Sequence, residues 1–231
     1  MSKEYPAGMD LLLSDVRYEM CQRCVRFINY EMVPGDIVEF GVYTGRSLAM
    51  FAHTQERYTK EVIHACDMKR KLIGLDSFEG LPTDFDGHPR WREGMFAMNH
   101  SRHPTLSVGD AVTADSVFDL FSALSLPKPE IITGDYDSDA VRENLSAVSS
   151  AVALVHIDCD LYESTLTALK LIEDKLQEGC ILMFDDWFNY KGNSSKGEQK
   201  AVKEWLSESQ WKLTPYQPYG TFCMSFIVCP K

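Results

Sequence analysis

The chain has 231 residues, of which 45% are hydrophobic, so it can bury one sizeable core but is short for two ordinary domains. Its formal net charge is −11, with 34 acidic against 23 basic side chains, which disfavours nucleic acid and membrane partners because both attract clustered cationic charge. It has neither an apolar run of about eighteen residues nor the basic-then-apolar pattern of a signal peptide, so we expect a cytoplasmic protein.

Residues 1–34 are predicted to be helical, because apolar side chains, Val16 among them, recur near helical spacing up to the turn signal that follows Val33. The seven cysteines do not form the two Cys-x-x-Cys pairs of a zinc site. Cys21 and Cys24 have that spacing, but they lie in this apolar segment, where free cysteines pack as small hydrophobes. We therefore interpret them as reduced structural thiols.

An apolar run at residues 37–41 leads through a glycine turn into a helix-like stretch at 47–58. Strand, glycine turn and helix form the opening unit of a doubly wound sheet. Further apolar runs, mostly with helix-like stretches between them, lie at residues 71–75, 130–133, 151–157 and 180–184. This alternation predicts parallel strands that are covered by helices on both faces.

The C-terminal part is expected to close the sheet with an antiparallel edge hairpin. Its strands are predicted at residues 211–214 and 221–228, with a loop at 215–220 between them. The result is a Rossmann-like α/β fold with a mostly parallel seven-stranded sheet, the usual outline of class I methyltransferases. We expect one domain over residues 1–231, with a lid or insertion at 80–127, where periodicity is weak.

The segment Glu39-Phe40-Gly41-Val42-Tyr43-Thr44-Gly45 places an acidic residue at a strand end and two glycines in the following turn. It differs from the Gly-x-Gly-x-x-Gly fingerprint, which brings a pyrophosphate onto a helix N-terminus. A ligand without phosphate, such as S-adenosylmethionine, therefore suits it better, and a purely structural turn is the alternative. The candidate donor-binding residues of this segment are Glu39, Gly41, Tyr43, Thr44, Gly45 and Ser47.

Asp76 ends the second predicted strand, where open α/β folds place a carboxylate that accepts hydrogen bonds from ribose hydroxyls. The alternative role is a turn cap. Ser77 follows it directly, Asp135 follows the predicted strand at 130–133, and Asp158 follows the strand at 151–157. We include all of them among the candidate donor-binding residues.

Asp158, Asp185 and Asp186 each come just after a strongly apolar strand. If these strands are neighbours, about 4.8 Å apart, the carboxylates converge at the edge where ligands bind and would repel one another without a cation. Oxygen ligands favour Mg²⁺, which would orient a hydroxyl and lower its pKa. The alternative is solvated acids that cap the next helix.

A general base must also reach the hydroxyl proton, and Asp160, two residues beyond Asp158, is the first candidate. His156 is the second, although a histidine in an apolar strand is more often a satisfied core residue. His100 and His103 lie in the expected lid, where they could meet a substrate.

Other functions explain fewer of these residues. An NAD-dependent oxidoreductase would use the fold and Asp76, but it lacks the full glycine fingerprint and leaves the strand-end aspartates unexplained. A metal-dependent hydrolase explains the aspartates without the glycine loop. A catalytically inactive donor-binding module does not need a metal. Transfer of a methyl group to a small-molecule hydroxyl uses all these features, and a homo-oligomer is compatible with the sequence.

Taken together, these segments resemble the macrocin O-methyltransferase family. The matching stretches are residues 33–42, 76–82 and 156–165, and the pair Asp185-Asp186. The resemblance implies S-adenosylmethionine as methyl donor, a Mg²⁺ site on Asp158, Asp185 and Asp186, and Asp160 as base. It also implies a hydroxyl on a sugar or aromatic part of a natural product as acceptor.

Overall fold

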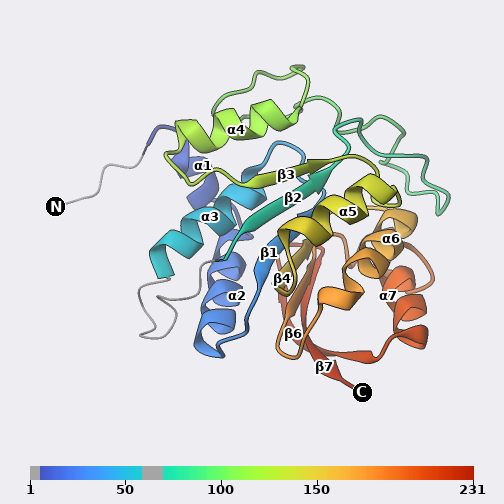
Figure 1. Ribbon diagram of the computed structural model, residues 1–231. Helices are drawn as coiled ribbons and strands as arrows, with labels where there is room; N and C mark the ends of the chain where they lie inside the picture. The colour runs from blue at the N-terminus through green and yellow to red at the C-terminus, as the bar shows by residue number, and fades with distance from the viewer. Residues whose placement is uncertain (1–5, 59–69) are drawn as a thin grey trace.

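The computed structural model describes residues 6–58 and 70–231, which contain a seven-stranded sheet of order β3-β2-β1-β4-β5-β7-β6 (Figure 1). Strands β1 to β5 are parallel, and β7 runs antiparallel to both β5 and β6. This confirms the predicted Rossmann-like outline. The strands are β1 (Asp36–Phe40), β2 (Leu72–Asp76), β3 (Glu130–Thr133), β4 (Val152–Ile157), β5 (Ile181–Phe184), β6 (Trp211–Tyr219) and β7 (Cys223–Pro230).

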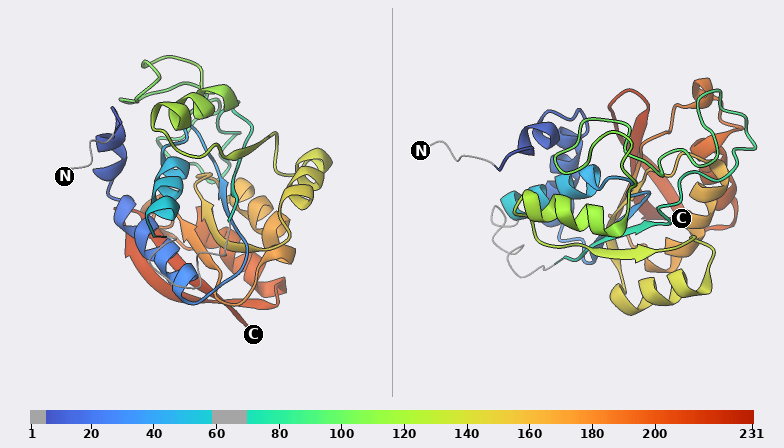
Figure 2. Two further views of the ribbon diagram at one scale, coloured as in Figure 1. Left: turned by 60° about the vertical axis from the view of Figure 1, so that its left-hand side comes forward. Right: turned by 90° about the horizontal axis from the view of Figure 1, so that it is seen from above.

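Helices cover both faces of the sheet. The helices are α1 (Met9–Leu13), α2 (Tyr18–Tyr30), α3 (Arg46–Tyr58), α4 (Ala114–Ala123), α5 (Asp139–Val148), α6 (Tyr162–Ile172) and α7 (Gly197–Glu208), with short 3₁₀ turns η2 (Glu173–Lys175) and η3 (Tyr190–Gly192). Figure 2 shows α2 and α3 on one side of the sheet and α5, α6 and α7 on the other. Each face of the sheet has its own hydrophobic core. Because side chains alternate along a strand, Ile37 and Leu154 pack in the core beneath α2 and α3, and Val38 and Val155 pack in the core beneath α5, α6 and α7.

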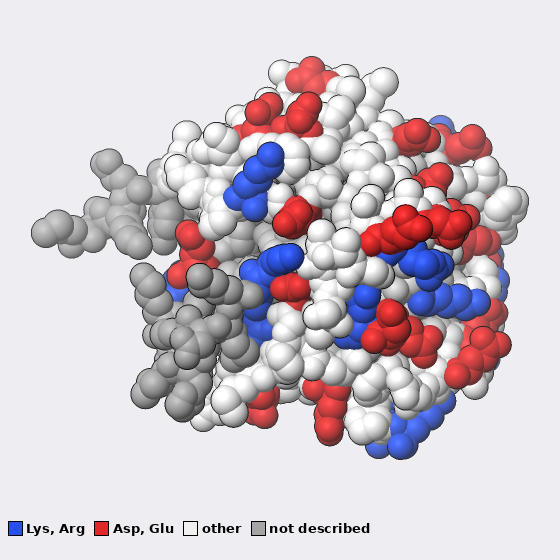
Figure 3. Space-filling model, in the orientation of Figure 1, with Lys and Arg blue, Asp and Glu red and all other residues white. Residues whose placement is uncertain are grey.

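The surface agrees with the acidic composition. Figure 3 shows acidic side chains spread over the face that it draws, with Lys and Arg side chains interspersed among them. Of the helices described here, none has the length and apolar character needed to cross a membrane.

The N-terminal helical segment forms two helices in its described part, residues 6–34, and only the placement of Val16 departs from the sequence-based prediction. Residues 14–17 separate α1 from α2, and Val16, predicted on an apolar helix face, is 74% exposed. The side chain of Asp15 accepts a hydrogen bond from the backbone N–H of Arg17, a local bond that competes with helix formation. Cys21 and Cys24 are buried in the core, as expected of structural thiols.

The edge hairpin also differs from its prediction. Residues 215–220 were expected to form a loop, but β6 continues to Tyr219 through Pro215 and Pro218. Proline has no backbone N–H to donate to a neighbouring strand, so it is tolerated mainly on edge strands. Because β6 is the edge strand of the sheet, one of its sides has no neighbouring strand to pair with, so missing amide donors are tolerated there.

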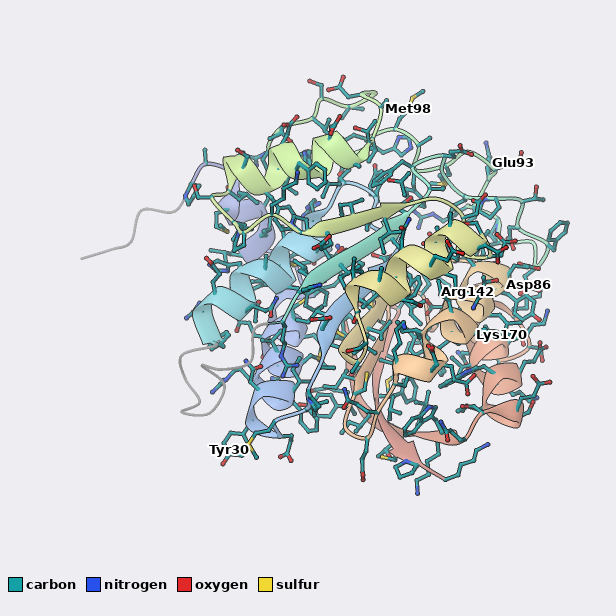
Figure 4. The ribbon with its side chains drawn as sticks, viewed as in Figure 1. Tyr30, Asp86, Glu93, Met98, Arg142 and Lys170 are labelled. Carbon is teal, nitrogen blue, oxygen red and sulfur yellow. The ribbon has the colours of Figure 1, made fainter. Side chains whose placement is uncertain are left out.

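The segment between β2 and α4 is largely irregular, as predicted for the first half of residues 80–127, and α4 occupies part of the second half. An isolated bridge between Met98 and Ala111 holds it together. In Figure 4, Met98, Glu93 and Asp86 mark its course along the rim of the molecule, from beside α4 toward α6 and α7. A role as a moving lid stays a prediction.

The ends of β1 and β4 approach so closely that position 41 has no room for a side chain. A Cβ on Gly41 would lie 1.8 Å from the carbonyl oxygen of Asp158, and the residue has a φ of +85°. We therefore expect Gly41→Ala to lower the free energy of unfolding by about 2–4 kcal/mol in urea denaturation, through overlap and backbone strain together.

Gly87→Ala is the matched control for this experiment. Gly87 also has a positive φ, of +74°, but its Cβ would meet no atom of the described residues within 4 Å. It should show the cost of the backbone conformation alone. Equal losses in the two variants would contradict the proposed overlap.

Candidate functional site

A cavity of about 1050 Å³ lies at the carboxyl ends of β1, β2, β4 and β5. The strand ends are aligned, because the N–H of Asp158 donates to the carbonyl of Phe40 and the N–H of Asp185 donates to that of Ile157. The predicted site residues that line the cavity are Gly41, Tyr43, Thr44, Ser47, Asp76, Ser77, Asp135, Asp158, Asp160, Asp185 and Asp186. The described lining does not include Glu39, Gly45 or His156.

The glycine loop is held by Asp76. One carboxylate oxygen of Asp76 accepts hydrogen bonds from the N–H groups of Val42 and Tyr43, at 2.8 and 2.7 Å, and the other accepts from Phe78. Burial raises the pKa of Asp76, although these bonds favour its charged form. The carboxylate thus fixes the turn and also faces the cavity, and its ribose-binding role stays a prediction.

Tyr43 connects the glycine loop to the irregular segment above it. Its hydroxyl donates to the carbonyl of Met98 and accepts from the N–H of His100, at 3.0 and 2.8 Å. His100 lines the cavity, whereas His103 is buried against the carbonyl of Thr44. The loop and the segment therefore form one wall of the site.

Glu39 and His156 form a fully buried pair on the neighbouring strands β1 and β4. The His156 Nδ1 atom lies 2.7 Å from Glu39 Oε1, and its Nε2 atom lies 3.8 Å from Asp185 Oδ1. Burial alone would lower the pKa of His156, but the nearby carboxylates of Asp185 and Glu39, the second of them hydrogen-bonded to Nδ1, raise it to about 10. The imidazole is thus positively charged and sits behind Asp185, outside the cavity. Sequence analysis placed Glu39 at the donor, and that assignment stays a prediction.

Arg17 lies between Asp158 and Asp185, a contact that sequence analysis missed. Its Nη1 atom is 3.3 Å from Asp158 Oδ2 and 3.3 Å from Asp185 Oδ2. At Asp185, Arg17 and His156 together outweigh the effect of burial and lower the pKa below its usual range. At Asp158, burial and the charge of Asp185 raise the pKa well above its usual value.

Asp160 and Asp186 form a second group of carboxylates. They hydrogen-bond to each other, and burial together with nearby carboxylates raises the pKa of both. Glu198, at the start of α7, accepts a hydrogen bond from the N–H of Asp186 while its other oxygen is buried without a partner. Glu198 was also missed, because no pattern in α7 separates it from an ordinary first-turn acid.

The residues present fit a hard divalent cation. Among the described residues, one atom each of His156, Asp158 and Asp185 lies within 4.8 Å of the others, and Asp186 lies outside this group. His156 could be a ligand only as the neutral imidazole, so the two carboxylates carry the fit. Carboxylates whose pKa values are raised by one another are stabilised when a cation neutralises them, and oxygen ligands suit Mg²⁺. The assignment of Asp158, Asp185 and Asp186 as its ligands stays a prediction.

Comparisons with known proteins show which family the chain resembles. A model of the macrocin-O-methyltransferase (TylF) family matches residues 3–210. The 8-demethyl-8-(2,3-dimethoxy-alpha-L-rhamnosyl)-tetracenomycin-C 4'-O-methyltransferase of Streptomyces olivaceus is 27% identical over 190 residues, or 81% of this chain. The demethyldecarbamoylnovobiocin O-methyltransferase of Streptomyces niveus is 26% identical over 188 residues, or 80% of this chain. The chain spans only 66% and 65% of these two relatives.

Solved structures show the same fold. CalS11, a calicheamicin methyltransferase, is 26% identical and has a TM-score of 0.65, over 95% of this chain and 79% of its own. The O-methyltransferase NovP is 24% identical and has a TM-score of 0.62, over 91% of this chain and 78% of its own.

The buried pair predicts a pH-dependent stability. In Glu39→Gln, the His156 imidazolium loses its charged partner, which typically costs about 3–5 kcal/mol for a buried pair. Since the pKa of His156 is raised from 6.5 to about 10, its stabilising contribution is complete below pH 6.5 and is lost as the pH rises toward 10. The deficit of Glu39→Gln, measured by urea denaturation, should therefore be largest near pH 6.5 and shrink toward pH 10.

Glu19→Gln is the control, because Glu19 is exposed and pairs with Arg23 at the surface. It should change the free energy of unfolding by less than about 1 kcal/mol at every pH. A deficit of Glu39→Gln that stays constant with pH would show that His156 is not the titrating group.

Proposed function

The chain belongs to the macrocin O-methyltransferase family, and we propose that it transfers the methyl group of S-adenosylmethionine to a hydroxyl of a small natural product. The observation that carries this proposal is that a single cavity joins the glycine loop of β1 to the carboxylates that follow β4 and β5. Neither an NAD-dependent oxidoreductase nor an inactive donor-binding module requires that combination.

The donor would lie along the glycine loop. Gly41, Tyr43 and Thr44 border the cavity there, with Asp76 on the neighbouring strand and Asp135 beyond β3. The absence of side chains at the glycines lets the backbone approach a ligand closely. This wall presents carboxylates and backbone groups, which suits a cationic sulfonium donor better than a pyrophosphate.

The acceptor hydroxyl would lie at the carboxylates. Asp158, Asp185 and Asp186 would hold Mg²⁺, and the bound ion would supply orientation of the hydroxyl and a lower hydroxyl pKa. Asp160, which lines the cavity two residues beyond Asp158, would accept the proton. The hydroxyl oxygen then bonds to the methyl carbon as the carbon–sulfur bond breaks, which leaves S-adenosylhomocysteine.

The acceptor is proposed to carry its hydroxyl on a sugar or an aromatic group. The name of one relative specifies 4'-O-methylation of a rhamnosyl-tetracenomycin, and the name of the other specifies O-methylation of demethyldecarbamoylnovobiocin. In this chain the cavity is bordered by Trp91, Phe96 and Phe222, whose rings can pack against a sugar ring or an aromatic ring.

The donor is tested by calorimetric titration of the purified chain with S-adenosylhomocysteine and with NAD, each with and without Mg²⁺. We expect S-adenosylhomocysteine to bind and NAD not to bind, because the loop lacks the pyrophosphate fingerprint. Binding of NAD without S-adenosylhomocysteine would overturn the proposed activity and assign Asp76 to a dehydrogenase.

Two substitutions separate the metal from the base. Asp158→Ala should abolish turnover and its dependence on Mg²⁺ while binding of S-adenosylhomocysteine survives. Asp160→Asn should reduce turnover by about 10²–10⁴-fold, the usual contribution of a general base, and largely keep the affinity for Mg²⁺. Turnover is measured by methyl transfer to an accepted substrate, and unchanged turnover in Asp160→Asn would remove Asp160 from the role of base.

A further inference from the structure

Arg17 is held by three carboxylates at the break between α1 and α2. Its Nη1 atom bridges Asp158 and Asp185 at 3.3 Å from each, and its Nε atom lies 3.1 Å from Asp15. The Arg17 side chain is 21% exposed and forms part of the cavity wall. The guanidinium is therefore a resident cation at two of the three aspartates to which the metal is assigned above.

A metal ion bound to the same two oxygens would compete with this cation for space and charge. Magnesium lies about 2.0–2.1 Å from its oxygen ligands, so an ion bonded to both Oδ2 atoms would meet the Nη1 group that also lies between them. Two cations at such a distance repel strongly at a partly buried site. An ion on these two oxygens and Arg17 in its present position would therefore be incompatible.

We propose that Arg17 and the divalent ion are alternative occupants of the Asp158–Asp185 pair, so that metal binding displaces Arg17 together with residues 14–17. This inference rests on the metal-assisted reaction proposed above and adds a conformational step to it. In the metal-free chain Arg17 would offset the mutual repulsion of the two carboxylates.

The displaced arginine would not be left without a partner. Asp15, which contacts Nε and Nη2 of Arg17, lies on the same segment and moves with it. Asp15 also contacts Arg46, the first residue of α3, which directly follows the glycine loop. The exchange would therefore transmit the presence of metal to the element that borders the donor.

The alternative is that Arg17 supports the metal site. The two possibilities predict opposite changes in the affinity for Mg²⁺ when Arg17 is replaced. The probe is Mg²⁺, titrated calorimetrically into the full chain and into Arg17→Gln. We expect at least about tenfold tighter binding to Arg17→Gln, because about 1.4 kcal/mol corresponds to tenfold and is of the order of one charged hydrogen bond. Equal or weaker binding would overturn the proposal.

Arg23→Gln is the matched control. Arg23 lies on α2, carries the same charge and contacts Glu19 and Gln217 at the surface. Its removal should leave the affinity for Mg²⁺ within about twofold, since exposed charges are screened by salt. A comparable tightening in Arg23→Gln would mean that the net charge of the chain is responsible, which would also overturn the exchange.

A second measurement uses the unaltered chain, in case Arg17→Gln does not fold. Hydrogen exchange of the peptide over residues 12–18 should become faster when Mg²⁺ is added, while a peptide within α5, which packs on the other face of the sheet from α2, stays unchanged. Unchanged exchange at residues 12–18 with metal bound would overturn the displacement.

Titration of each variant with S-adenosylhomocysteine separates this proposal from the proposed function. Metal affinity that is indifferent to Arg17→Gln, with the donor analogue still bound, would overturn the exchange alone. Absence of Mg²⁺ binding in every variant would overturn both the exchange and the metal-assisted part of the proposed function.

Discussion

The need to balance negative charge where β4 and β5 end governs the rest of the site. Burying a carboxylate is unfavourable unless a cation or a proton neutralises it. On one side, Arg17 and His156 neutralise Asp185, and Glu39 in turn neutralises His156. The break between α1 and α2 brings Arg17 to this edge, and the pair of Glu39 and His156 places compensating charge inside the neighbouring strands β1 and β4.

The alternation of side chains divides the carboxylates between two environments. Asp185 contacts Arg17 and His156. Its neighbour Asp186 lies near Asp160, and the backbone N–H of Asp186 donates a hydrogen bond to Glu198. The first environment is nearly neutral, while the second retains carboxylates whose pKa values are raised. The two consecutive aspartates therefore have different partners: Asp185 has the cations of Arg17 and His156, whereas the side chain of Asp186 accepts a hydrogen bond from Asn189.

Sequence patterns predicted the strand-end residues well, because apolar runs mark buried strands and parallel strands align their carboxyl ends. Asp158, Asp160 and Asp185 therefore meet in one cavity as expected. Arg17 could not be predicted in this way, since it is 141 residues from Asp158 and the apolar spacing continues through Val16. The register of Glu39 beside His156 depends on strand order, which no local pattern specifies.

The two outer strands of the sheet limit how this chain can associate with others. An exposed strand edge normally offers a row of amide donors that a strand of another molecule can pair with. Pro215 and Pro218 remove two of these donors from β6, and at the opposite edge β3 has only four residues. Extension of the sheet from one molecule to the next is thereby discouraged at both ends. Contacts through helices or loops would not meet this obstacle, and the sheet itself is less suited to template fibrous aggregates.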